Sequence, residues 1–519
     1  LTYFGNADYD EITDIALDAE GNVLIGLTTL SALLPTTDAI QAEPSGGFDL
    51  YLARLDPSLT TLLQATYLGG TNNDYLTDLE LGPDGSIFLR GVTRSTDFPT
   101  ENPLQGDLAG DHDDFIVRLS SDGSSIVYST YLGGSGSEGR SAGLLEPIEG
   151  QLAIAPDGSA WLTGWTGSHD FPTVAPLQSE HGGGEADCHV MQLSADGTEL
   201  LFSTFLGGDS NDRCHDIALD ADGAIHLLGV TSSRNPSLLN PDGIGGDGYP
   251  GSVSYLARLS PGGAGLDNLF RHHDVASSDG SPPSVTILKH LLVDSRGAAH
   301  AAGFTWRADV PLAHPVQDEL NLGVNDSATD ALVMTLSPDG DTVELSTYLG
   351  GGTGMSPSAP WGDDYALDIA LDAGGRLLVT GETHSLDFPT VEPIQPDYDT
   401  SGSIPFPWSS DAFILRIGGL DIPTLRVRPG VSNNLDMGWD ETNGDPRFGI
   451  YRGTLESLVR RHAYDHALVT DCHLRTNATV PIAEESSYFL LARFEQDGRQ
   501  DFGVDSRGRR RGGPDTPCP

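Results

Sequence analysis

One short phrase recurs along the chain, and this repetition constrains the fold more than any other feature of the sequence. It reads Thr-Tyr-Leu-Gly-Gly at residues 66–70, 130–134 and 347–351, Thr-Phe-Leu-Gly-Gly at 204–208, and Thr-Tyr-Phe-Gly at 2–5. Self-similarity of this kind indicates an array of similar units, each of which packs against its neighbours. The first question is therefore what one unit contains.

Three further phrases recur along the chain, with the length and pattern of strands and turns. An Ile-Ala-Leu-Asp-type run begins at residues 15, 79, 154, 217, 292 and 369, and Asp-Phe-Pro-Thr occupies 97–100, 170–173 and 387–390. A third run, which ends in Arg-Leu or a variant of it, occupies 49–55, 114–119, 187–193, 255–259, 330–336 and 411–417. The apolar runs have strand length, and the Asp-Gly segments between them favour tight turns, because glycine accepts a positive φ.

One period therefore comprises four antiparallel strands, A to D, with tight turns after A and C and a long loop after B. Four such strands per repeat are typical of a β-propeller blade. Strand A occurs six times, which predicts an all-β chain with a six-bladed β-propeller over residues 1–419. The fifth blade is degenerate, because Phe-Arg-His-His-Asp at 270–274 replaces the Leu-Gly-Gly phrase.

The two ends of the repeat array predict how the ring closes. The sixth blade ends after strand C at residue 417, and residues 1–5 carry a strand-D phrase without the strands that should precede it. We expect the N-terminal strand to complete the sixth blade, because this removes an exposed strand edge. In the alternative, this strand pairs with a neighbouring molecule and builds a chain of subunits.

The combined pattern resembles the SBBP-type β-propeller repeat. The matching phrases are Thr-Tyr-Leu-Gly-Gly, Asp-Ile-Ala-Leu-Asp-x-x-Gly, Thr-Gly-x-Thr-x-Ser-x-Asp-Phe-Pro-Thr and Asp-Ala-Phe-Ile-x-Arg-Leu. The resemblance covers about residues 1–419 and is clearest in blades two, three and six, whereas blades four and five depart from it. It implies a secreted or surface bacterial protein from a family that is mostly without an assigned activity.

Residues 420–519 differ in composition, which indicates a second domain. They hold 15 acidic and 13 basic residues, whereas residues 1–419 hold 60 acidic and 14 basic ones. Apolar runs at 435–439, 448–453, 487–493 and 502–504 predict the strands of a small β-sandwich. Trp439 and the runs at 450–453 and 488–492 resemble a fibronectin-type-III-like module. The ending resembles the terminal form of large secreted bacterial proteins, which implies that Cys518 pairs with Cys472.

The formal charge of −48 limits the partners of the chain, in which Lys289 is the only lysine. Such a surface repels nucleic acid and anionic membranes and suits divalent cations, basic partners or a salty medium. A soluble acidic protein from a GC-rich or salt-adapted organism would have the same composition. No apolar run approaches the roughly 20 residues that span a bilayer, so we expect no transmembrane segment.

The four cysteines fall two in each region, which favours disulfides and an oxidising compartment. Cys188 precedes strand C of blade three and Cys214 precedes strand A of blade four, so both are expected on the loop face of adjacent blades, where a disulfide is geometrically reasonable. A redox or metal pair is the alternative. The chain begins at Leu1, as a processed secreted protein or a trimmed chain would. We therefore expect an extracellular or bacterial cell-surface location.

Carboxylates recur near the start of strand A and are candidate ligands of calcium, the one cofactor that the sequence suggests. Calcium takes about six to eight oxygen ligands from flexible acidic loops. The alternative is that each carboxylate caps its own turn by accepting backbone N–H groups. The candidates are Asp14, Asp74, Asp78, Asp212, Asp216, Asp364 and Asp368.

Signatures of catalysis are missing from the sequence. It contains no Gly-x-Ser-x-Gly elbow, His-Glu-x-x-His motif or P-loop. Histidines follow three of the cysteines, but without Cys-x-x-Cys-His they give no support for covalent haem. The histidines of blade five fix no metal-ligand set, so we interpret them as bystanders. They are His272, His273, His290, His300 and His314.

The sequence therefore predicts a non-enzymatic structural or adhesive protein, secreted or on the cell surface. A basic cluster in an acidic chain suggests contacts between copies that propagate into filaments or layers, although a solvated chain end is the simpler explanation. The cluster comprises Arg507, Arg509, Arg510 and Arg511. The alternative function is a carbohydrate-binding or carbohydrate-cleaving propeller that works through the face of the long D–A and B–C loops. Further copies of the chain and a polysaccharide are thus the expected partners.

Overall fold

The structure is a computed structural model of the 519-residue chain. It describes residues 5–6, 8–139, 150–233, 237–239, 253–271, 286–321, 328–352, 362–372, 374–390 and 410–417, and beyond these the backbone of seven strands. The chain divides into two compact units, one of Leu1–Ala370 with Val379–Leu415 and the other of Leu371–Leu378 with Arg416–Pro519. The described residues are all-β apart from one turn of 3-10 helix, η1 (Pro261–Gly263), and include no helix that could cross a membrane.

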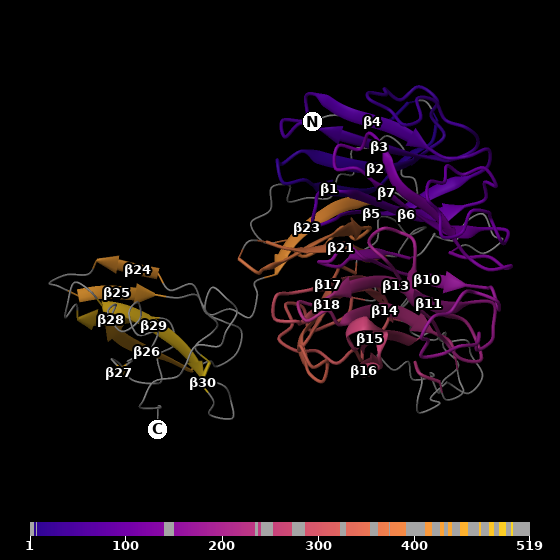
Figure 1. Cartoon of the computed structure of the whole chain (residues 1–519). Helices are drawn as coiled ribbons and strands as arrows, with labels where there is room; N and C mark the ends of the chain where they lie inside the picture. Colours follow the sequence, from indigo (N-terminus) through magenta and orange to yellow (C-terminus); the bar gives the residue numbers. More distant parts are fainter. Residues whose placement is uncertain are drawn as a thin grey trace. The chain divides into compact units, whose positions relative to one another are not determined.

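Six small antiparallel sheets follow one another along the chain and form the blades of a β-propeller (Figure 1). Blades one and two consist of β1 (Asp10–Leu17), β2 (Val23–Thr29), β3 (Asp49–Leu55), β4 (Leu62–Leu68), β5 (Asp74–Leu81), β6 (Ile87–Thr93), β7 (Asp113–Leu119) and β8 (Ile126–Leu132). Blades three and four consist of β9 (Leu152–Ile154), β10 (Ala160–Thr166), β11 (Asp187–Leu193), β12 (Leu200–Leu206), β13 (Asp212–Leu219), β14 (Ile225–Thr231), β15 (Val253–Leu259) and β16 (Leu266–Arg271). Blades five and six consist of β17 (Thr286–Val293), β18 (Ala299–Thr305), β19 (Asp330–Leu336), β20 (Val343–Leu349), β21 (Asp364–Leu371), β22 (Leu377–Thr383) and β23 (Asp411–Ile417).

The strands of each blade pair in chain order, as the repeats predict, so the six-bladed β-propeller is confirmed. The sixth sheet has three described strands, and in Figure 1 its β21 and β23 lie between β1 and β17. Residues 1–4, which we expect to supply its fourth strand, lie outside the described residues. Ring closure by the N-terminal strand therefore stays a prediction.

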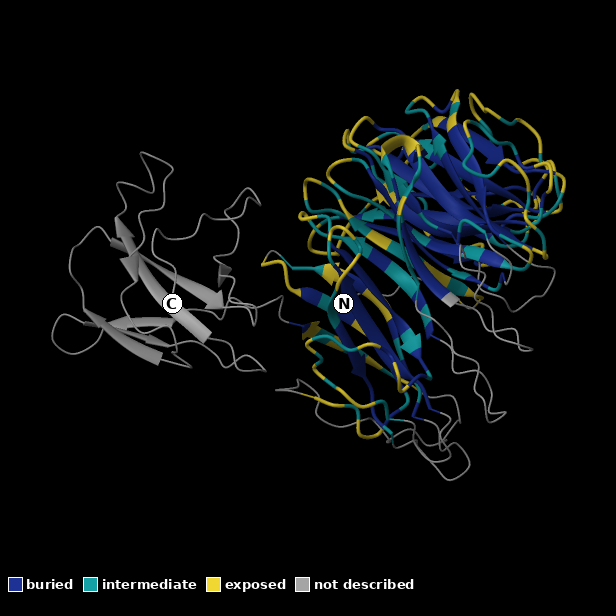
Figure 2. Ribbon diagram, turned by 90° about the horizontal axis from the view of Figure 1, so that it is seen from below, coloured by how far each residue is buried: buried dark blue, intermediate teal, exposed yellow. Residues whose placement is uncertain are grey.

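The hydrophobic core lies largely between neighbouring blades, where Figure 2 shows mostly buried strands. One cluster joins Leu24 and Leu52 of blade one to Leu79 and Leu89 of blade two. Polar groups of the repeated phrases hold the loops onto this core. The hydroxyl of the buried Tyr131, in a Thr-Tyr-Leu-Gly-Gly phrase, donates to the Ser95 carbonyl at 2.7 Å and accepts from the Phe98 N–H at 3.0 Å. This pairing links that phrase to Asp-Phe-Pro-Thr.

The inner strands carry a β-bulge that matters for the site. In β1, β5, β13 and β17 the register with the next strand skips one residue, which leaves that residue outside the ladder. The skipped residues are Thr13, Thr77, His215 and Lys289. A bulge bends the strand locally and re-aims the side chain of the residue that the ladder skips. Blades four and five thus present a basic residue where blades one and two present threonine.

The second unit contains two antiparallel sheets. Their strands are β24 (Arg426–Pro429), β25 (Asn434–Gly438), β26 (Arg447–Thr454), β27 (Ala467–Leu468), β28 (Asn477–Pro481), β29 (Ser487–Phe494) and β30 (Gln500–Asp501). The order is β24-β25-β28 in one sheet and β27-β26-β29-β30 in the other. The predicted boundary after residue 419 stays a prediction. Cys472, Cys518, the four arginines of 507–511 and the histidines at 272–273 lie outside the described residues.

Candidate functional site

The first residue of several inner strands is an acid that binds the preceding Gly-Gly loop. Asp74 accepts the Gly70 N–H at 2.6 Å and the Ser95 hydroxyl at 3.0 Å. The same two bonds form at Asp212 with Gly208 and Ser233, and at Asp364 with Gly351 and Ser385, at 2.7–2.8 Å. These three predicted residues thus accept backbone N–H groups as a turn cap does.

A second acid, at the start of strand C in the preceding blade, faces the first and is absent from the sequence predictions. A methyl group on Gly69 would lie 2.2 Å from Oδ1 of Asp49 and 3.0 Å from Oδ2 of Asp74, so the two carboxylates flank this glycine. Asp49 is fully buried, and its Oδ1 has no hydrogen-bond partner among the described residues. Burial raises the pKa of both acids to about 6.

This acid pair recurs at other blade junctions. Asp113 and Glu138 flank Gly133, and Asp330 and Asp364 flank Gly350. Burial raises the pKa of Asp330 to about 8 and that of Asp364 to about 7. The signal in the sequence is the aspartate that opens strand C in the same repeat as each Leu-Gly-Gly phrase, which the search for strand-A acids passed over.

The other four predicted acids lie further along the inner strands, and three of them connect neighbouring blades. Each of the three accepts a backbone N–H from the inner strand of the next blade. Asp14 accepts from Leu79 at 3.0 Å, Asp78 from Leu152 at 2.7 Å, and Asp216 from Leu291 at 2.6 Å. The fourth, Asp368, accepts the N–H of its own neighbour Ile369 at 2.7 Å.

These inner acids influence one another and Glu80 of β5, which the sequence analysis did not single out. Burial, reinforced by the Asp14 charge, raises the pKa of Glu80 to about 7. Burial and the charges of Asp14 and Glu80 hold the pKa of Asp78 well above its usual range. Burial raises the pKa of Asp216 to about 8. Several acids on the inner strands therefore carry a proton near neutral pH.

The seven calcium candidates thus comprise three loop-capping acids, three blade-connecting acids and Asp368, which bonds to its own neighbour. Within the part of the chain that the structure describes, no group of three or more His, Cys, Asp and Glu side chains is arranged to hold a metal ion. Calcium binding by these residues stays a prediction.

A disulfide joins Cys188 of β11 to Cys214 of β13, as predicted, with the Cα atoms 5.1 Å apart. It connects blades three and four, and both cysteines are fully buried. They lie within strands rather than in the loops before them. The pair is therefore a structural staple, which removes the redox and metal alternatives for these two residues in the bonded form.

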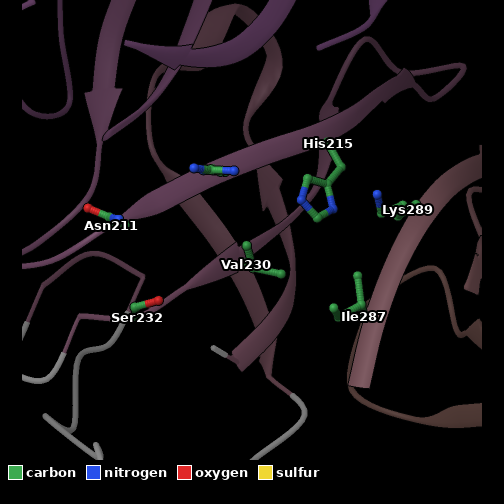
Figure 3. Close-up of a pocket in the computed structure, with 7 residues that line it drawn as sticks. Asn211, His215, Val230, Ser232, Ile287 and Lys289 are labelled. Carbon is green, nitrogen blue, oxygen red and sulfur yellow. The ribbon is translucent and has the colours of Figure 1, made fainter. Parts of the chain in front are cut away.

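A pocket of about 280 Å³ opens between blades four and five, at the start of β13 and β17 (Figure 3). We call it the inter-blade pocket. Its lining residues are Asn211, Arg213, His215, Val230, Ser232, Ile287 and Lys289. Arg213 and His215 come from β13, and Ile287 and Lys289 from β17, so two adjacent inner strands form its walls.

The inter-blade pocket gathers cationic groups in a strongly acidic protein. His290, next to Lys289, has its pKa lowered to about 4 by burial and by the nearby Lys289 and His215. Eight arginines of the described propeller have a carboxylate partner: Arg54, Arg90, Arg94, Arg118, Arg258, Arg296, Arg307 and Arg376. Lys289 has none within ion-pair distance among the described residues.

Comparison with known proteins assigns this chain to no family. No family model and no curated protein matches the sequence. Among solved structures, a Dyadobacter fermentans protein of unknown function is similar over 75% of this chain and 94% of its own, at 11% identity and a TM-score of 0.37. A variant of NanB sialidase from Streptococcus pneumoniae is similar over 74% and 67%, at 8% identity and a TM-score of 0.39. A PL25 ulvan lyase is similar over 71% and 75%, at 10% identity and a TM-score of 0.34. These weak likenesses support no inference about activity.

Proposed function

We propose that this chain is an extracellular, non-enzymatic protein of structural or adhesive type, which binds a carbohydrate polymer on the face of its D–A and B–C loops. The observation that carries the proposal is the inter-blade pocket, because none of the seven lining residues that the structure describes is a carboxylate. Most glycosidases need two carboxylates beside the scissile bond. Amide, hydroxyl and cationic groups in a small pocket suit binding rather than cleavage.

The repeats and the second unit support our proposal that the chain is a secreted SBBP-type propeller with a fibronectin-type-III-like module. The phrases of residues 1–419 suit an SBBP-type propeller. The two sheets of the second unit, with three and four strands, suit a fibronectin-type-III-like sandwich. The Cys188–Cys214 disulfide suits an oxidising compartment, which agrees with secretion or display on a cell surface.

Self-assembly is part of this proposal. The arginines at 507, 509, 510 and 511 would dock on the acidic propeller of another copy, and such a head-to-tail contact propagates. Light scattering and negative-stain microscopy of the native chain test it, and we expect large particles that shrink as salt screens the contact. A monomer at low ionic strength would remove the assembly role.

A carbohydrate-cleaving propeller is the alternative function. The observation in its favour is the group of inner-strand acids, since a carboxyl with a pKa of about 7, such as Glu80, suits a general acid. The hydrogen bonds of Asp14, Asp78 and Asp216 to the next blade favour a structural role for their carboxylates instead.

Binding and cleavage can be separated in one experiment on the full chain. Affinity electrophoresis in gels that contain neutral or acidic polysaccharides measures retention, and a reducing-end assay on the same polymers measures cleavage. We expect a polysaccharide gel to retard the chain, and we expect no release of reducing ends. Release that disappears in Glu80→Gln would establish the cleaving alternative, and a chain that no polysaccharide retards would overturn the proposed function.

A further inference from the structure

We propose that the inter-blade pocket is an anion site, which takes the carboxylate or sulfate group of an acidic sugar. This inference rests on the proposed function for the choice of a sugar, whereas the choice of an anion rests on the pocket itself. A carboxylate and a sulfate group would be bound by the same donors of the protein, and the experiment below distinguishes them.

The bulges of the inner strands bring the basic side chains together. His215 of β13 and Lys289 of β17 are the residues that the ladder skips in adjacent blades. Thr13 and Thr77 occupy the same position in blades one and two. Strand pairing does not require a basic residue at a bulge, because the neutral Thr13 and Thr77 stand there in the same fold. The presence of a basic residue instead of threonine in two adjacent blades therefore points to a ligand.

The charge on Lys289 is exceptional in this chain. It is the only lysine of a chain with a formal charge of −48, and it is half-buried on an inner strand. The eight arginines described above are held by carboxylates, whereas Lys289 has no carboxylate within ion-pair distance in the described part of the chain. Lys289 therefore offers a half-buried positive charge with which an anion can pair.

Neighbouring groups hold two other cationic side chains in place. The Arg213 guanidinium lies over the Trp165 ring of blade three, 5.2 Å from its centroid. The imidazole Nδ1 of His215 lies 2.9 Å from the Leu288 carbonyl oxygen, to which it donates across the blade junction. Side chains that are fixed before binding lose little conformational entropy when a ligand binds, so the fixed Arg213 and His215 side chains favour a higher affinity. Figure 3 shows His215 and Lys289 on facing strands.

The acids that alternate with these residues on β13 are occupied elsewhere. Asp212 accepts the Gly208 N–H at 2.7 Å, and Asp216 accepts the N–H groups of Leu291 and Ile217 at 2.6 and 2.7 Å. Neither aspartate lines the pocket. Among the lining residues that the structure describes there are three basic side chains and no acid, which is the composition expected of an oxyanion site.

The remaining lining residues indicate what the anion is attached to. The Asn211 amide and the Ser232 hydroxyl provide polar partners for hydroxyl groups, and Val230 and Ile287 provide a small apolar surface. A volume of about 280 Å³ lies just below the roughly 300–1,000 Å³ of pockets that enclose drug-sized ligands. A single acidic sugar residue meets these conditions better than a large cofactor does.

Isothermal titration calorimetry on the full chain tests the inference, with sodium glucuronate, sodium sulfate and glucose as probes. We expect one or both anions to bind and glucose to give no heat of binding. Stronger binding of glucuronate identifies a carboxylate ligand, and stronger binding of sulfate identifies a sulfate ester. A wild-type chain that binds neither anion would overturn the inference.

Lys289→Gln and Arg213→Gln are the informative variants, each compared with Arg94→Gln. Arg94 lies in a B–C loop on the same face and is 45% exposed, so its replacement removes one charge from the face but none from the pocket. We expect a loss of roughly tenfold or more in anion affinity for the pocket variants and little change for the control. Equal affinity in all four proteins, with unchanged circular dichroism, would contradict the anion site.

The two proposals fail in different ways. Retention on polysaccharides together with no anion binding would remove the anion site and leave the proposed function. Anion binding that depends on Lys289, together with no retention on any polysaccharide, would remove the proposed function and leave the anion site.

Discussion

Asp78 on β5 accepts the backbone N–H of Leu152 on β9 at 2.7 Å, so a side chain of blade two completes the hydrogen bonding of blade three. Asp14 and Asp216 make the corresponding bond from blades one and four. An inner strand has no neighbour on its channel side, and its exposed backbone donors need partners. These aspartates supply them and couple one blade to the next.

The first prediction concerns this bond. Asp78→Ala leaves the Leu152 N–H without its partner, and we expect the free energy of unfolding to fall by about 1–3 kcal/mol. Asp78→Asn keeps an acceptor oxygen and removes the repulsion from Asp14 and Glu80, so it should be neutral or stabilising. Urea denaturation measures both variants. Equal losses for Ala and Asn would show that the charge, rather than the hydrogen bond, is what stabilises the junction.

The second prediction concerns glycine in the repeated phrase. Gly69→Ala places a methyl group 2.2 Å from Oδ1 of Asp49, so we expect a loss of roughly 1–3 kcal/mol in stability. Gly265→Ala is the matched control, because the nearest atom to its added methyl would be the Ser260 hydroxyl at 3.6 Å. Thermal unfolding of the two variants should separate them by several degrees. If both variants have the same melting temperature, the acid pair is not the reason why residue 69 is glycine.

The third prediction concerns pH. The folded chain raises the pKa of Asp49 and Asp74 to about 6, of Asp187 to about 7 and of Asp330 to about 8, all above the unfolded value near 3.9. Between about pH 4 and pH 8 these four carboxyls therefore bind more protons in the folded state than in the unfolded state, and their contribution to stability falls as pH rises. We expect a higher melting temperature at pH 5 than at pH 8. Asp49→Asn should flatten this slope, and a melting temperature that rises from pH 5 to pH 8 would contradict the assignment.

The fourth prediction concerns calcium. Calcium that binds the paired carboxylates would neutralise them, so we expect millimolar calcium to raise the melting temperature at pH 8 relative to the chelator EDTA. Saturation at about 100 times Kd corresponds to about 2.7 kcal/mol for one site. The increase should be smaller in Asp74→Asn. Identical melting curves with calcium and with EDTA would exclude the seven aspartates as calcium ligands.

The fifth prediction concerns the disulfide. Cys188 and Cys214 are 26 residues apart in sequence, and closing such a loop stabilises a chain by about 3.5 kcal/mol in the loop-entropy treatment. We expect the Cys188→Ala/Cys214→Ala double variant to lose much of this amount in urea denaturation. Because both cysteines are fully buried, reduction of the native chain should be slow without denaturant. Rapid reduction, measured by mass after alkylation, would show that the junction between blades three and four opens readily.

The regular parts of the fold could be predicted from the sequence because each blade repeats the same local pattern. The runs at 49–55, 330–336 and 411–417 coincide with strands β3, β19 and β23. Alternating apolar residues bounded by Asp-Gly turns are sufficient for this, since both signals act within a few residues. The Cys188–Cys214 pairing also followed from the blade geometry, because the ring makes blades three and four neighbours.

The site could not be predicted because its parts meet only in the assembled ring. Lys289 and His215 line the same pocket only when blades four and five pack together and both inner strands contain a bulge. The pairing of Asp49 with Asp74 likewise depends on a junction between blades. A search along the chain finds the acids that open strand A, but it carries no information on which residue each of them faces.

The bulged residues of β1, β5, β13 and β17 have a further consequence for how this protein could change over evolution. Since the ladder skips these residues, a different side chain can stand at each of them without loss of a strand hydrogen bond, as Thr13, His215 and Lys289 show. Duplicated blades could therefore diverge in ligand preference through single codon changes at these positions while the ring continued to fold. Blade one, with Thr13, would be the natural place to engineer a second specificity, whereas Thr77 of blade two accepts a hydrogen bond from the buried Arg90 at 3.0 Å.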